Sequence, residues 1–391
     1  MLAYLFERFP KFSQTFCYRE IAELFRQGVQ PEIFALRAAD LGPETDWDNA
    51  IVSRVHQLPE GDAFARLADE AAASLSTAGR KTLHEWRGKP DSLRLHQATY
   101  IGTRLRKLGV RHVHAHFAGM AARTAFWIHK LFSIDYSLTV HANDIFVPNK
   151  FQVGLPEILG SASAIVAVSD FAANQLRERF PETASRVHRI YNGIDPARFH
   201  PGEVEQPPLI LSIGRLINKK GFDILVDACA LLRKHAHEFR CEIIGEGPLA
   251  PELQARIERQ QVRERVHLAG PKRQLDVAAR LSEATVLALP CRIDSDGAMD
   301  NLPTVIMEAM ACALPVVSTD IAGISEMVCN GETGFLVAEN DPGETAGALS
   351  RLIRDRELAR SFGLSGRQCA EDVFSIEKNV RDLREVFELS L

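Results

Sequence analysis

The sequence contains no apolar run that approaches the roughly 20 residues a helix needs to cross a bilayer. Its first ten residues carry Glu7 and Arg8 and do not have the layout of a signal peptide. The seven cysteines are scattered without a C-x-x-C pair, a pattern that favours reduced, buried thiols over disulfides or a zinc site. We therefore expect a cytoplasmic protein.

The sequence also has little excess charge of either sign. Its formal net charge is -5 and 25% of its residues are charged, which argues against nucleic-acid binding driven by bulk electrostatics. No tandem repeat or low-complexity tract interrupts the chain. Its 391 residues and 46% hydrophobic content suit two globular domains of roughly 150–200 residues each.

Short apolar runs alternate with amphipathic helical patterns along the whole chain, which predicts an α/β protein with parallel sheets covered by helices on both faces. The strands expected in the first half are Leu2–Phe6, Glu32–Leu36, Val110–Ala115, Tyr136–Val140, Ala164–Val168 and Val187–Ile190. Those expected in the second half are Ile210–Ile213, Cys241–Ile244, Val266–Leu268, Thr285–Leu289, Pro315–Ser318 and Phe335–Val337. A helix is expected to begin near Ser13 and to end at Gly28.

A stretch rich in proline and charge lies between the two series of strands, as is typical of a linker. It predicts an N-terminal domain over residues 1–197, a linker over 198–208 and a C-terminal domain over 209–375. A last helix is expected over 376–391. The pattern leaves open whether this helix packs back on the first domain.

One candidate binding loop follows the first strand of the second half. The strand ends at Gly214, Arg215 comes next, and Lys220 stands just before a helix. Ligands of doubly wound sheets bind at the carboxyl ends of strands, where a helix N-terminus offers unpaired N–H groups. Arg215 and Lys220 are therefore candidates to hold a diphosphate, and solvated surface cations are the alternative. The loop is not a G-x-x-x-x-G-K-[ST] phosphate loop, which argues against an ordinary ATPase.

A second candidate loop follows the strand Thr285–Leu289. Asp300 stands at its end, Pro303 suits the first turn of the helix that follows, and Glu308 lies inside that helix. Carboxylates accept hydrogen bonds from vicinal sugar hydroxyls, so both acids are candidates for a ribose or hexose site. The alternatives are a helix cap for Asp300 and a structural carboxylate for Glu308.

These segments, in this order, resemble the retaining glycosyltransferases of family four, which have the GT-B fold of two Rossmann-like domains facing an interdomain cleft. The matching segments are NGID at 192–195, GR at 214–215 with KG at 220–221, GEGPL at 245–249, EAMACALPVV at 308–317 and GFLV at 334–337. Two positions depart from the family pattern. The first acid of the family's E-x7-E motif is the shorter Asp300, and Ala313 replaces the glycine before P-V-V.

The resemblance implies a transfer from a UDP- or GDP-hexose that needs no metal and no further cofactor. It puts Arg215 and Lys220 on the diphosphate, Glu308 on the ribose and Asp300 at the transferred sugar. The rest of the implied donor site consists of Gly214, Gly245, Asn301, Leu302, Pro303 and Thr304. The D-x-D sequence at 294–296 matches a metal signature of a different glycosyltransferase fold, and we interpret it as a surface loop.

The N-terminal half is expected to bind the acceptor. The segment FPKFSQTF at 9–16 resembles the opening of family members that build bacterial surface polysaccharides, and Ser13 or Thr15 is a candidate cap of the first helix. The segment HANDIF at 141–146 supplies His141 and Asp144, and the resemblance puts the histidine near the reacting sugar.

Three histidines alternate along one expected strand, at positions 112, 114 and 116. They share one face, as ligands of a metal would, but no carboxylate follows nearby in the sequence. We interpret them as structural or acceptor-side residues, with His116 the candidate for the acceptor side, and expect no metal.

The sequence thus predicts a hexosyltransferase acting on a lipid-linked or oligosaccharide acceptor in bacterial surface polysaccharide synthesis. Another GT-B enzyme, such as a nucleotide-sugar epimerase, and a low-activity nucleotide-binding assembly module are the alternatives. Peripheral contact with the inner face of the plasma membrane is compatible with a basic and aromatic stretch near the N-terminus. Packing of the same aromatic rings in the core is the simpler interpretation. This stretch consists of Arg8, Phe9, Lys11, Phe12, Phe16, Tyr18 and Arg19.

Overall fold

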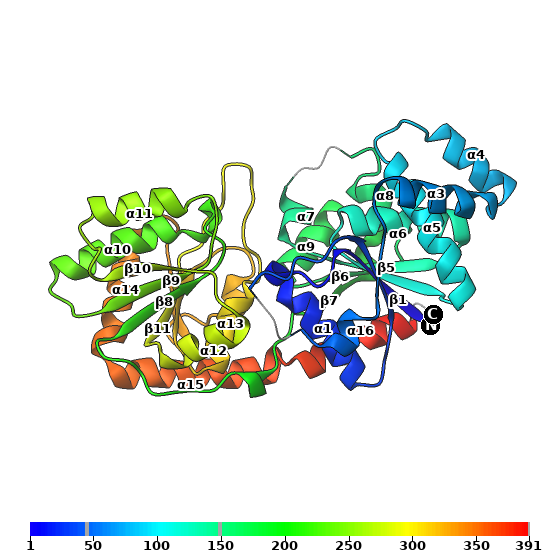
Figure 1. The fold of residues 1–391 in the computed structure, drawn as a ribbon. Helices are drawn as coiled ribbons and strands as arrows, with labels where there is room; N and C mark the ends of the chain where they lie inside the picture. The colour runs from blue at the N-terminus through cyan, green and yellow to red at the C-terminus, as the bar shows by residue number, and fades with distance from the viewer. Residues whose placement is uncertain (44–46, 148–150, 390–391) are drawn as a thin grey trace. The chain divides into compact units, whose positions relative to one another are not determined.

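The computed structural model describes residues 1–43, 47–147 and 151–389 of the chain, which fold into two α/β units (Figure 1). The first unit contains Met1–Gly42, most of the chain up to Tyr191, and the C-terminal stretch that begins at Asn379. The second unit contains Asn192–Lys378. Among the described helices, none has the length and apolar character that a membrane crossing requires.

In its described part, the first unit contains a seven-stranded sheet with the order β3-β2-β1-β4-β5-β6-β7, and each neighbouring pair is parallel. Its strands are β1 (Leu2–Arg8), β2 (Glu32–Arg37), β3 (Val55–Gln57), β4 (His112–His116), β5 (Asp135–Val140), β6 (Ala164–Ala167) and β7 (Val187–Arg189). The expected strands of the first half are confirmed. Strand β3 was not predicted, because it is three residues long and polar.

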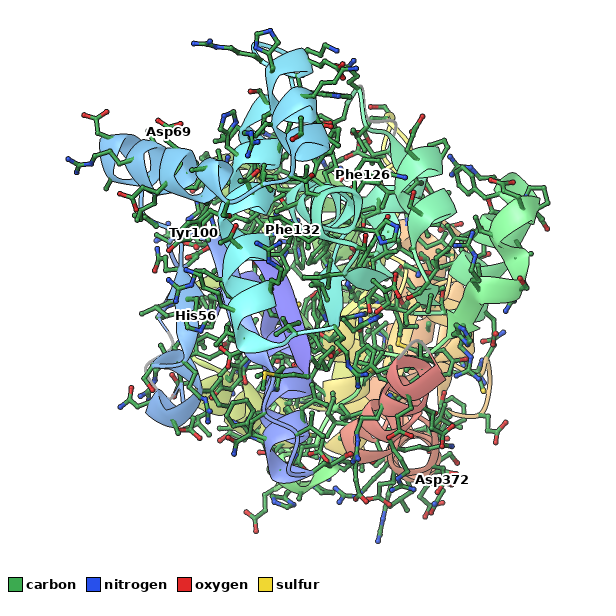
Figure 2. All side chains as sticks on the ribbon, turned by 90° about the vertical axis from the view of Figure 1, so that its right-hand side faces the viewer. His56, Asp69, Tyr100, Phe126, Phe132 and Asp372 are labelled. Carbon is green, nitrogen blue, oxygen red and sulfur yellow. The ribbon has the colours of Figure 1, made fainter. Side chains whose placement is uncertain are left out.

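The helices of the first unit connect these strands and cover both faces of the sheet (Figure 1). They are α1 (Thr15–Arg26), α2 (Asn49–Val52), α3 (Gly61–Ala73), α4 (Thr77–Glu85), α5 (Ser92–Leu108), α6 (Met120–Phe132), α7 (Ala142–Phe146), α8 (Leu155–Ser161) and α9 (Asp170–Arg179). Helix α3 packs on α5, and its outer face carries exposed side chains such as Asp69 (Figure 2).

The prediction that Ser13 or Thr15 caps the first helix is wrong. A 3-10 turn, Phe12–Gln14, precedes α1, so Ser13 lies within that turn and Thr15 is already the first helical residue. The residue at the N-cap is Gln14, whose side chain makes no capping hydrogen bond. The chain thus enters α1 directly from the 3-10 turn, without a side-chain cap.

The last helix, α16 (Ile376–Leu389), runs from the end of the second unit into the first. The ring of Phe387 lies 6.0 Å from that of Tyr4 on β1 and 5.0 Å from that of His114 on β4. Arg384 Nη1 donates a hydrogen bond to Gln27 Oε1 at 3.1 Å. The helix therefore packs on the first unit, while residues 390 and 391 of the expected helix lie outside the described part of the chain.

The described second unit contains a six-stranded sheet of parallel neighbours in the order β10-β9-β8-β11-β12-β13. Its strands are β8 (Leu209–Ile213), β9 (Arg240–Ile244), β10 (Val266–Gly270), β11 (Val286–Leu289), β12 (Val316–Thr319) and β13 (Gly334–Val337). Its helices are α10 (Phe222–Lys234), α11 (Ala250–Arg259), α12 (Gln274–Glu283), α13 (Thr304–Ala311), α14 (Pro342–Arg354) and α15 (Arg356–Val373). All strands expected in the second half are present.

The proline-rich stretch that was predicted as a linker belongs to the second unit. The backbone N–H of Gly202 donates to the carbonyl of Ser282 at 3.2 Å, and that of Glu205 donates to Glu283 at 2.9 Å. These bonds hold the stretch against the end of α12. The chain thus passes from one unit to the other at 191–192, before the expected linker at 198–208.

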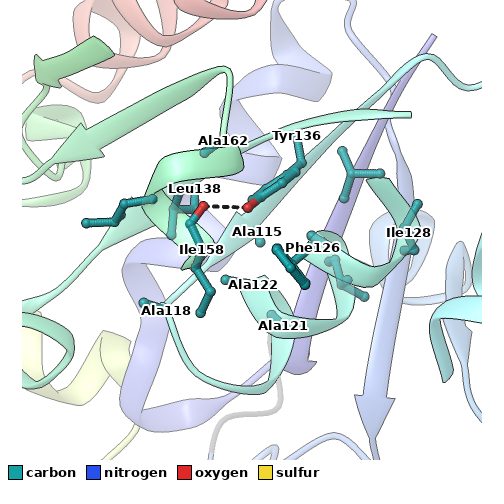
Figure 3. Packing of buried hydrophobic residues seen from close by; sticks show 14 of the residues in the cluster. Ala115, Ala118, Ala121, Ala122, Phe126, Ile128, Tyr136, Leu138, Ile158 and Ala162 are labelled. Atoms are coloured by element: carbon teal, nitrogen blue, oxygen red, sulfur yellow. Dashed lines mark hydrogen bonds between the residues drawn. The ribbon is translucent and has the colours of Figure 1, made fainter. Parts of the chain in front are cut away.

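The core of the first unit combines small residues of α6 with larger residues of β5 and α8 (Figure 3). Ala121 and Ala122 on α6 are fully buried, so this helix can approach the sheet closely. The hydroxyl of Tyr136 on β5 donates to the carbonyl of Ile158 at 2.5 Å, which satisfies the one polar atom that the aromatic ring carries into the core. The result is a rigid support for the loops at the carboxyl ends of the strands.

Helix α13 ends in a Schellman motif centred on Ala313, the position where the family pattern has glycine. Ala313 has a φ of 55°, its N–H donates to Met310 O at 2.9 Å, and the N–H of Leu314 donates to Ala309 O at 3.0 Å. Alanine in this left-handed conformation is strained by about 1 kcal/mol relative to glycine.

We expect Ala313→Gly to stabilise the second unit by about 0.5–1 kcal/mol, because the relieved strain exceeds the added entropy of the unfolded chain. A higher midpoint of thermal or urea unfolding would show this. The control is Ala309→Gly inside the same helix, which should destabilise by about 1 kcal/mol. An unfolding midpoint that falls in both variants would contradict the prediction.

Candidate functional site

The loop between β8 and α10 is held against the neighbouring loops by close backbone approaches at two glycines. Gly221 has a φ of 64°, and a Cβ there would lie 1.8 Å from the carbonyl oxygen of Pro290. Gly245 has a φ of 143°, and a Cβ there would lie 1.9 Å from the carbonyl oxygen of Gly214. The glycine motifs of the sequence thus bring the carboxyl ends of β8, β9 and β11 together.

Asp300 lies between two lysines of this loop. Lys219 Nζ is 2.9 Å from Asp300 Oδ1, and Lys220 Nζ forms an ion pair with Oδ2. Lys219 also donates to the carbonyl oxygen of Met299 at 3.1 Å. The side chains are largely buried, with exposed fractions of 9% for Lys219 and 14% for the other two. One carboxylate therefore neutralises part of the charge of two ammonium groups in a sheltered site.

The charges of Asp300 and Lys220 are stable over the whole physiological pH range. Burial opposes ionisation of Asp300, but Lys220 and Lys219 outweigh it and lower the pKa of the carboxyl to about 2. Burial likewise opposes the charge of Lys220, yet Asp300 raises the pKa of its ammonium group above the ordinary value. The cluster is thus an ionic triad at neutral pH.

The triad changes the interpretation of two predicted residues. Asp300 is not a helix cap, because the N-cap of α13 is Pro303 and the carboxylate is engaged with the lysines. Pro303 itself stands one position before the first turn in which it was expected. Lys219, which directly precedes Lys220 in the loop, is also buried, and its ammonium group holds one oxygen of Asp300.

The other predicted donor residues lie on the same loops or in helix α13, which follows the second of them. Arg215 is exposed directly after Gly214, and Thr304 begins α13. Glu308 is 7% exposed in the second turn of that helix. The residues between Asp300 and the helix are buried: Asn301, Leu302 and Pro303.

The D-x-D sequence forms a local turn, as the surface-loop interpretation expects. Asp294 Oδ1 accepts hydrogen bonds from Asn218 Nδ2 at 2.8 Å and from the backbone N–H of Ser295 at 2.9 Å. Asp296 Oδ1 accepts from the backbone N–H of Ala298 at 2.9 Å. These carboxylates stabilise the loop that leads to Asp300.

In the first unit, the carboxyl ends of β4 and β5 bring His116 and His141 together. His116 Nδ1 lies 3.4 Å from His141 Nε2, and His116 Nε2 lies 3.1 Å from Glu20 Oε1. The hydroxyl of Tyr4 donates to the same oxygen of Glu20 at 2.7 Å. Glu20 comes from α1, 96 residues before His116, so the pattern of the strand alone could not reveal it.

The two histidines differ in charge. Burial opposes protonation of His116, but Cys17 and Glu20 raise its pKa to about 10. Burial and the neighbouring His116 lower the pKa of His141 far below its ordinary value, so His141 is neutral at pH 7. Asp144 accepts a hydrogen bond from the backbone N–H of His141 at 2.9 Å, and burial raises its pKa to about 6. Asp144 therefore holds the backbone of His141.

The backbone beside His141 is strained. Phe117, which follows β4, has a φ of 69°, a conformation that bulky residues rarely adopt. Its ring lies 4.3 Å from that of His141, and the ring of Phe16 lies 5.0 Å from it. Such strain clusters at functional sites, which supports a functional role for this end of the sheet. Ser13 is exposed on the turn before α1.

His112 and His114 serve the sheet. His112 Nε2 and His114 Nδ1 lie 2.7 Å and 2.8 Å from Ser137 Oγ, and His114 Nε2 lies 2.9 Å from Thr139 Oγ1. Glu20, His114 and His116 have ligand atoms within 4.8 Å of one another and are the described group that has the composition of a metal site. Because both nitrogens of His114 are already hydrogen-bonded, a metal would have to displace Thr139 or Ser137.

We expect Asp300→Asn to destabilise the protein by about 3 kcal/mol, because it leaves two buried ammonium groups without their counter-charge. The midpoint of thermal unfolding at pH 7 measures the loss. Asp320→Asn is the control, since Asp320 is exposed in the same unit. Equal midpoints for the two variants would mean that the triad does not stabilise the fold.

Comparisons with known proteins agree with the architecture. Residues 13–198 match the family described as Glycosyltransferase Family 4, and residues 194–368 match Glycosyl transferases group 1. Among solved structures, a glycosyltransferase from Rickettsia africae ESF-5 has a TM-score of 0.74 at 18% identity and covers 99% of this chain and 98% of its own. Anabaena Alr3699/HepE in complex with UDP has a TM-score of 0.72 at 17% identity, with full coverage of both chains (100%).

Curated relatives extend over almost the whole chain. The putative colanic acid biosynthesis glycosyltransferase WcaL of Escherichia coli (strain K12) is 32% identical over 372 residues, which cover 90% of this chain and 91% of WcaL. The amylovoran biosynthesis glycosyltransferase AmsK of Erwinia amylovora is 27% identical over 404 residues, with 99% of both chains covered. The chain therefore belongs to the glycosyltransferases of family four and has their GT-B fold of two Rossmann-like domains.

Proposed function

We propose that this glycosyltransferase transfers a hexose from a UDP- or GDP-hexose, with retention of configuration, to a lipid-linked or oligosaccharide acceptor during synthesis of a bacterial surface polysaccharide. The second unit takes the donor and the first unit takes the acceptor. The observation that carries the donor assignment is the triad of Lys219, Lys220 and Asp300 at the carboxyl end of β8. Relatives named for colanic acid and amylovoran biosynthesis support the polysaccharide assignment.

The triad suits a nucleotide sugar because its two lysines hold different oxygens of Asp300. A diphosphate competes with Asp300 for Lys220, while Lys219 keeps the carboxylate in place through Oδ1. Asp300 Oδ2 is then free to accept a hydrogen bond from a hydroxyl of the sugar. The ion pair of the free protein is thus replaced by two contacts with the donor, one from Lys220 to the diphosphate and one from Asp300 to the sugar. Asp300 can therefore contact the sugar although its side chain is short.

The chemical step follows from these contacts. The bond between the sugar carbon C1 and the diphosphate oxygen breaks, and Lys220 and Arg215 stabilise the charge that develops on the departing diphosphate. The acceptor hydroxyl forms the new bond to C1 on the same face and gives up its proton to the departing diphosphate. Neutral His141 offers a hydrogen bond on the acceptor side. Glu308 is assigned to the ribose hydroxyls of the donor.

We expect Lys220→Ala to weaken binding of UDP or GDP by about 10- to 100-fold, the effect of losing one charge-assisted hydrogen bond. Titration calorimetry with both nucleotides measures this and identifies the base. Slow hydrolysis of the matching nucleotide hexose should fall with binding and persist in EDTA. Lys234→Ala, at the exposed far end of α10, is the matched control.

Unchanged nucleotide binding in Lys220→Ala would contradict the site assignment. Tight nucleotide binding by the unmodified protein without turnover of any nucleotide hexose would contradict the transferase assignment and favour an assembly module. Loss of hydrolysis in EDTA would contradict the metal-free mechanism.

We expect Asp300→Glu to change the choice of sugar and to leave nucleotide affinity within about twofold. The longer side chain shifts the carboxylate by one methylene relative to the sugar, while it keeps the charge that holds Lys219. Relative rates of hydrolysis across a panel of UDP- and GDP-hexoses should change by about fivefold, which is the effect expected from gaining or losing one hydrogen bond. An identical ranking and identical rates in both proteins would mean that residue 300 does not contact the sugar.

A further inference from the structure

Arg94 is a buried cation in the first turn of α5 that the proposed reaction does not use. Its side chain is 6% exposed, and its Nη1 atom is buried without a hydrogen-bond acceptor among the residues that the structure describes. Buried guanidinium groups are normally paired, because burial of an uncompensated charge costs stability. The unused donor of Arg94 is therefore available to an anion from outside the protein.

The nearby carboxylate of Asp91 is committed to other partners. Its Oδ1 accepts a hydrogen bond from Arg123 Nη1 at 2.5 Å, and its Oδ2 accepts from the backbone N–H of Val153 at 3.1 Å. Arg123 also lies over the ring of Phe151, 3.6 Å from its centroid. Asp91 is fully buried in this arrangement, so its charge serves Arg123 rather than Arg94.

The surroundings add positive charge. Arg123 lies in the first turn of α6, which follows β4, and Arg37 ends β2, where it pairs with Glu7 at 3.3 Å. Strands β2 and β4 both run parallel to β1, which lies between them, so both arginines stand at the carboxyl edge of the sheet. Burial, Arg123 and Arg37 lower the pKa of Arg94 to about 10, so the group stays charged at neutral pH. Three guanidinium groups thus face two carboxylates.

A second unsatisfied polar atom lies one turn further along α5. The Oε1 atom of Gln97 is buried without a donor among the described residues, and Gln97 is 7% exposed. Residues three positions apart share one face of a helix, so Arg94 and Gln97 lie on the same face of α5. Together they suit a ligand group that combines an oxyanion with a hydroxyl.

We propose that Arg94 and Gln97 form an oxyanion subsite of the first unit, which recognises a phosphate or a sugar carboxylate of the acceptor. Arg94 pairs with the anion, and Gln97 accepts a hydrogen bond from an adjoining hydroxyl. Arg123 adds positive charge from α6, which packs against α5 (Figure 1). The assignment of this ligand to the acceptor rests on the proposed function, whereas the subsite itself rests on α5 alone.

Titration calorimetry of the full chain with inorganic phosphate, glucuronate and glucose tests the subsite. We use the Lys220→Ala background, so that phosphate binds only weakly at the donor triad. Phosphate or glucuronate should bind, glucose should not, and Arg94→Met should weaken anion binding at least about tenfold. Arg94→Lys should restore part of the affinity. Binding of phosphate alone identifies a phosphorylated acceptor, and binding of glucuronate alone identifies an acidic glycan.

The proposal would be overturned if Arg94→Met bound the anions as tightly as the protein that keeps Arg94. It would also be overturned if neither protein bound any anion. Failure of the donor hydrolysis described above would overturn the transferase assignment and leave these affinities untouched, so the two failures are distinguishable.

Thermal unfolding without ligand gives an independent readout. Arg94→Met keeps most of the side-chain volume and removes the uncompensated charge, so we expect a higher unfolding midpoint. Arg123→Met is the matched control, and it should lower the midpoint because it leaves Asp91 buried without its partner. A lower midpoint in Arg94→Met would show that Arg94 stabilises the fold through a structural contact, and would overturn the proposal.

Discussion

The ion pairs of Asp300 with Lys219 and Lys220 are the constraint on which the proposed donor site of this glycosyltransferase depends. They join the loop after β8 to the loop after β11, which are about eighty residues apart in the chain. Without a bound nucleotide, a sheltered site with two ammonium groups needs a counter-charge, and Asp300 provides it. In the proposed function, the same carboxylate holds the ammonium groups of both lysines at the place assigned to the diphosphate. Under that proposal, one residue both stabilises the free protein and prepares the site for the donor.

The first unit is organised by buried polar groups in a different way. Glu20 and Tyr4 approach His116 from α1 and β1, and His116 in turn lies beside neutral His141. At this edge of the sheet, His141 lies next to the charged ring of His116 and to Phe117, whose backbone is strained. Arg94 belongs to the same edge, on α5. In the part of the unit that the structure describes, this edge contains neutral His141 and the buried guanidinium group of Arg94, which we propose to meet an acidic group of the acceptor.

Much of the fold could be predicted from the sequence because central parallel strands are continuous apolar runs. Strand β3 could not be predicted because it is short and lies at the edge of the sheet. Its His56 is held by a polar contact, with Nε2 at 2.7 Å from Glu32 Oε2, rather than by apolar packing. The motifs single out Lys220, Asp300 and His141 as site candidates, but they give no indication of the contacts made by Lys219 and Glu20. Lys219 and Glu20 pair with residues far away in the sequence, and local patterns carry no signal for such contacts. The conformation of Ala313 was likewise visible only once the end of α13 was seen.

The hydrogen bonds of Ser137 have a consequence for how the first sheet assembles. One hydroxyl lies between His112 and His114 of the adjacent strand, and it has a single proton to donate, so at least one imidazole must donate to it. Burial lowers the pKa of both histidines, to about 4 for His112, which keeps the rings neutral and able to donate and accept. A shift of β4 by one residue along β5 would place the histidine rings beside apolar side chains, where they would lose these hydrogen bonds. The hydrogen-bonded histidines therefore favour the observed register of β4 on β5 over a one-residue slip, and this register determines where His116 and His141 lie.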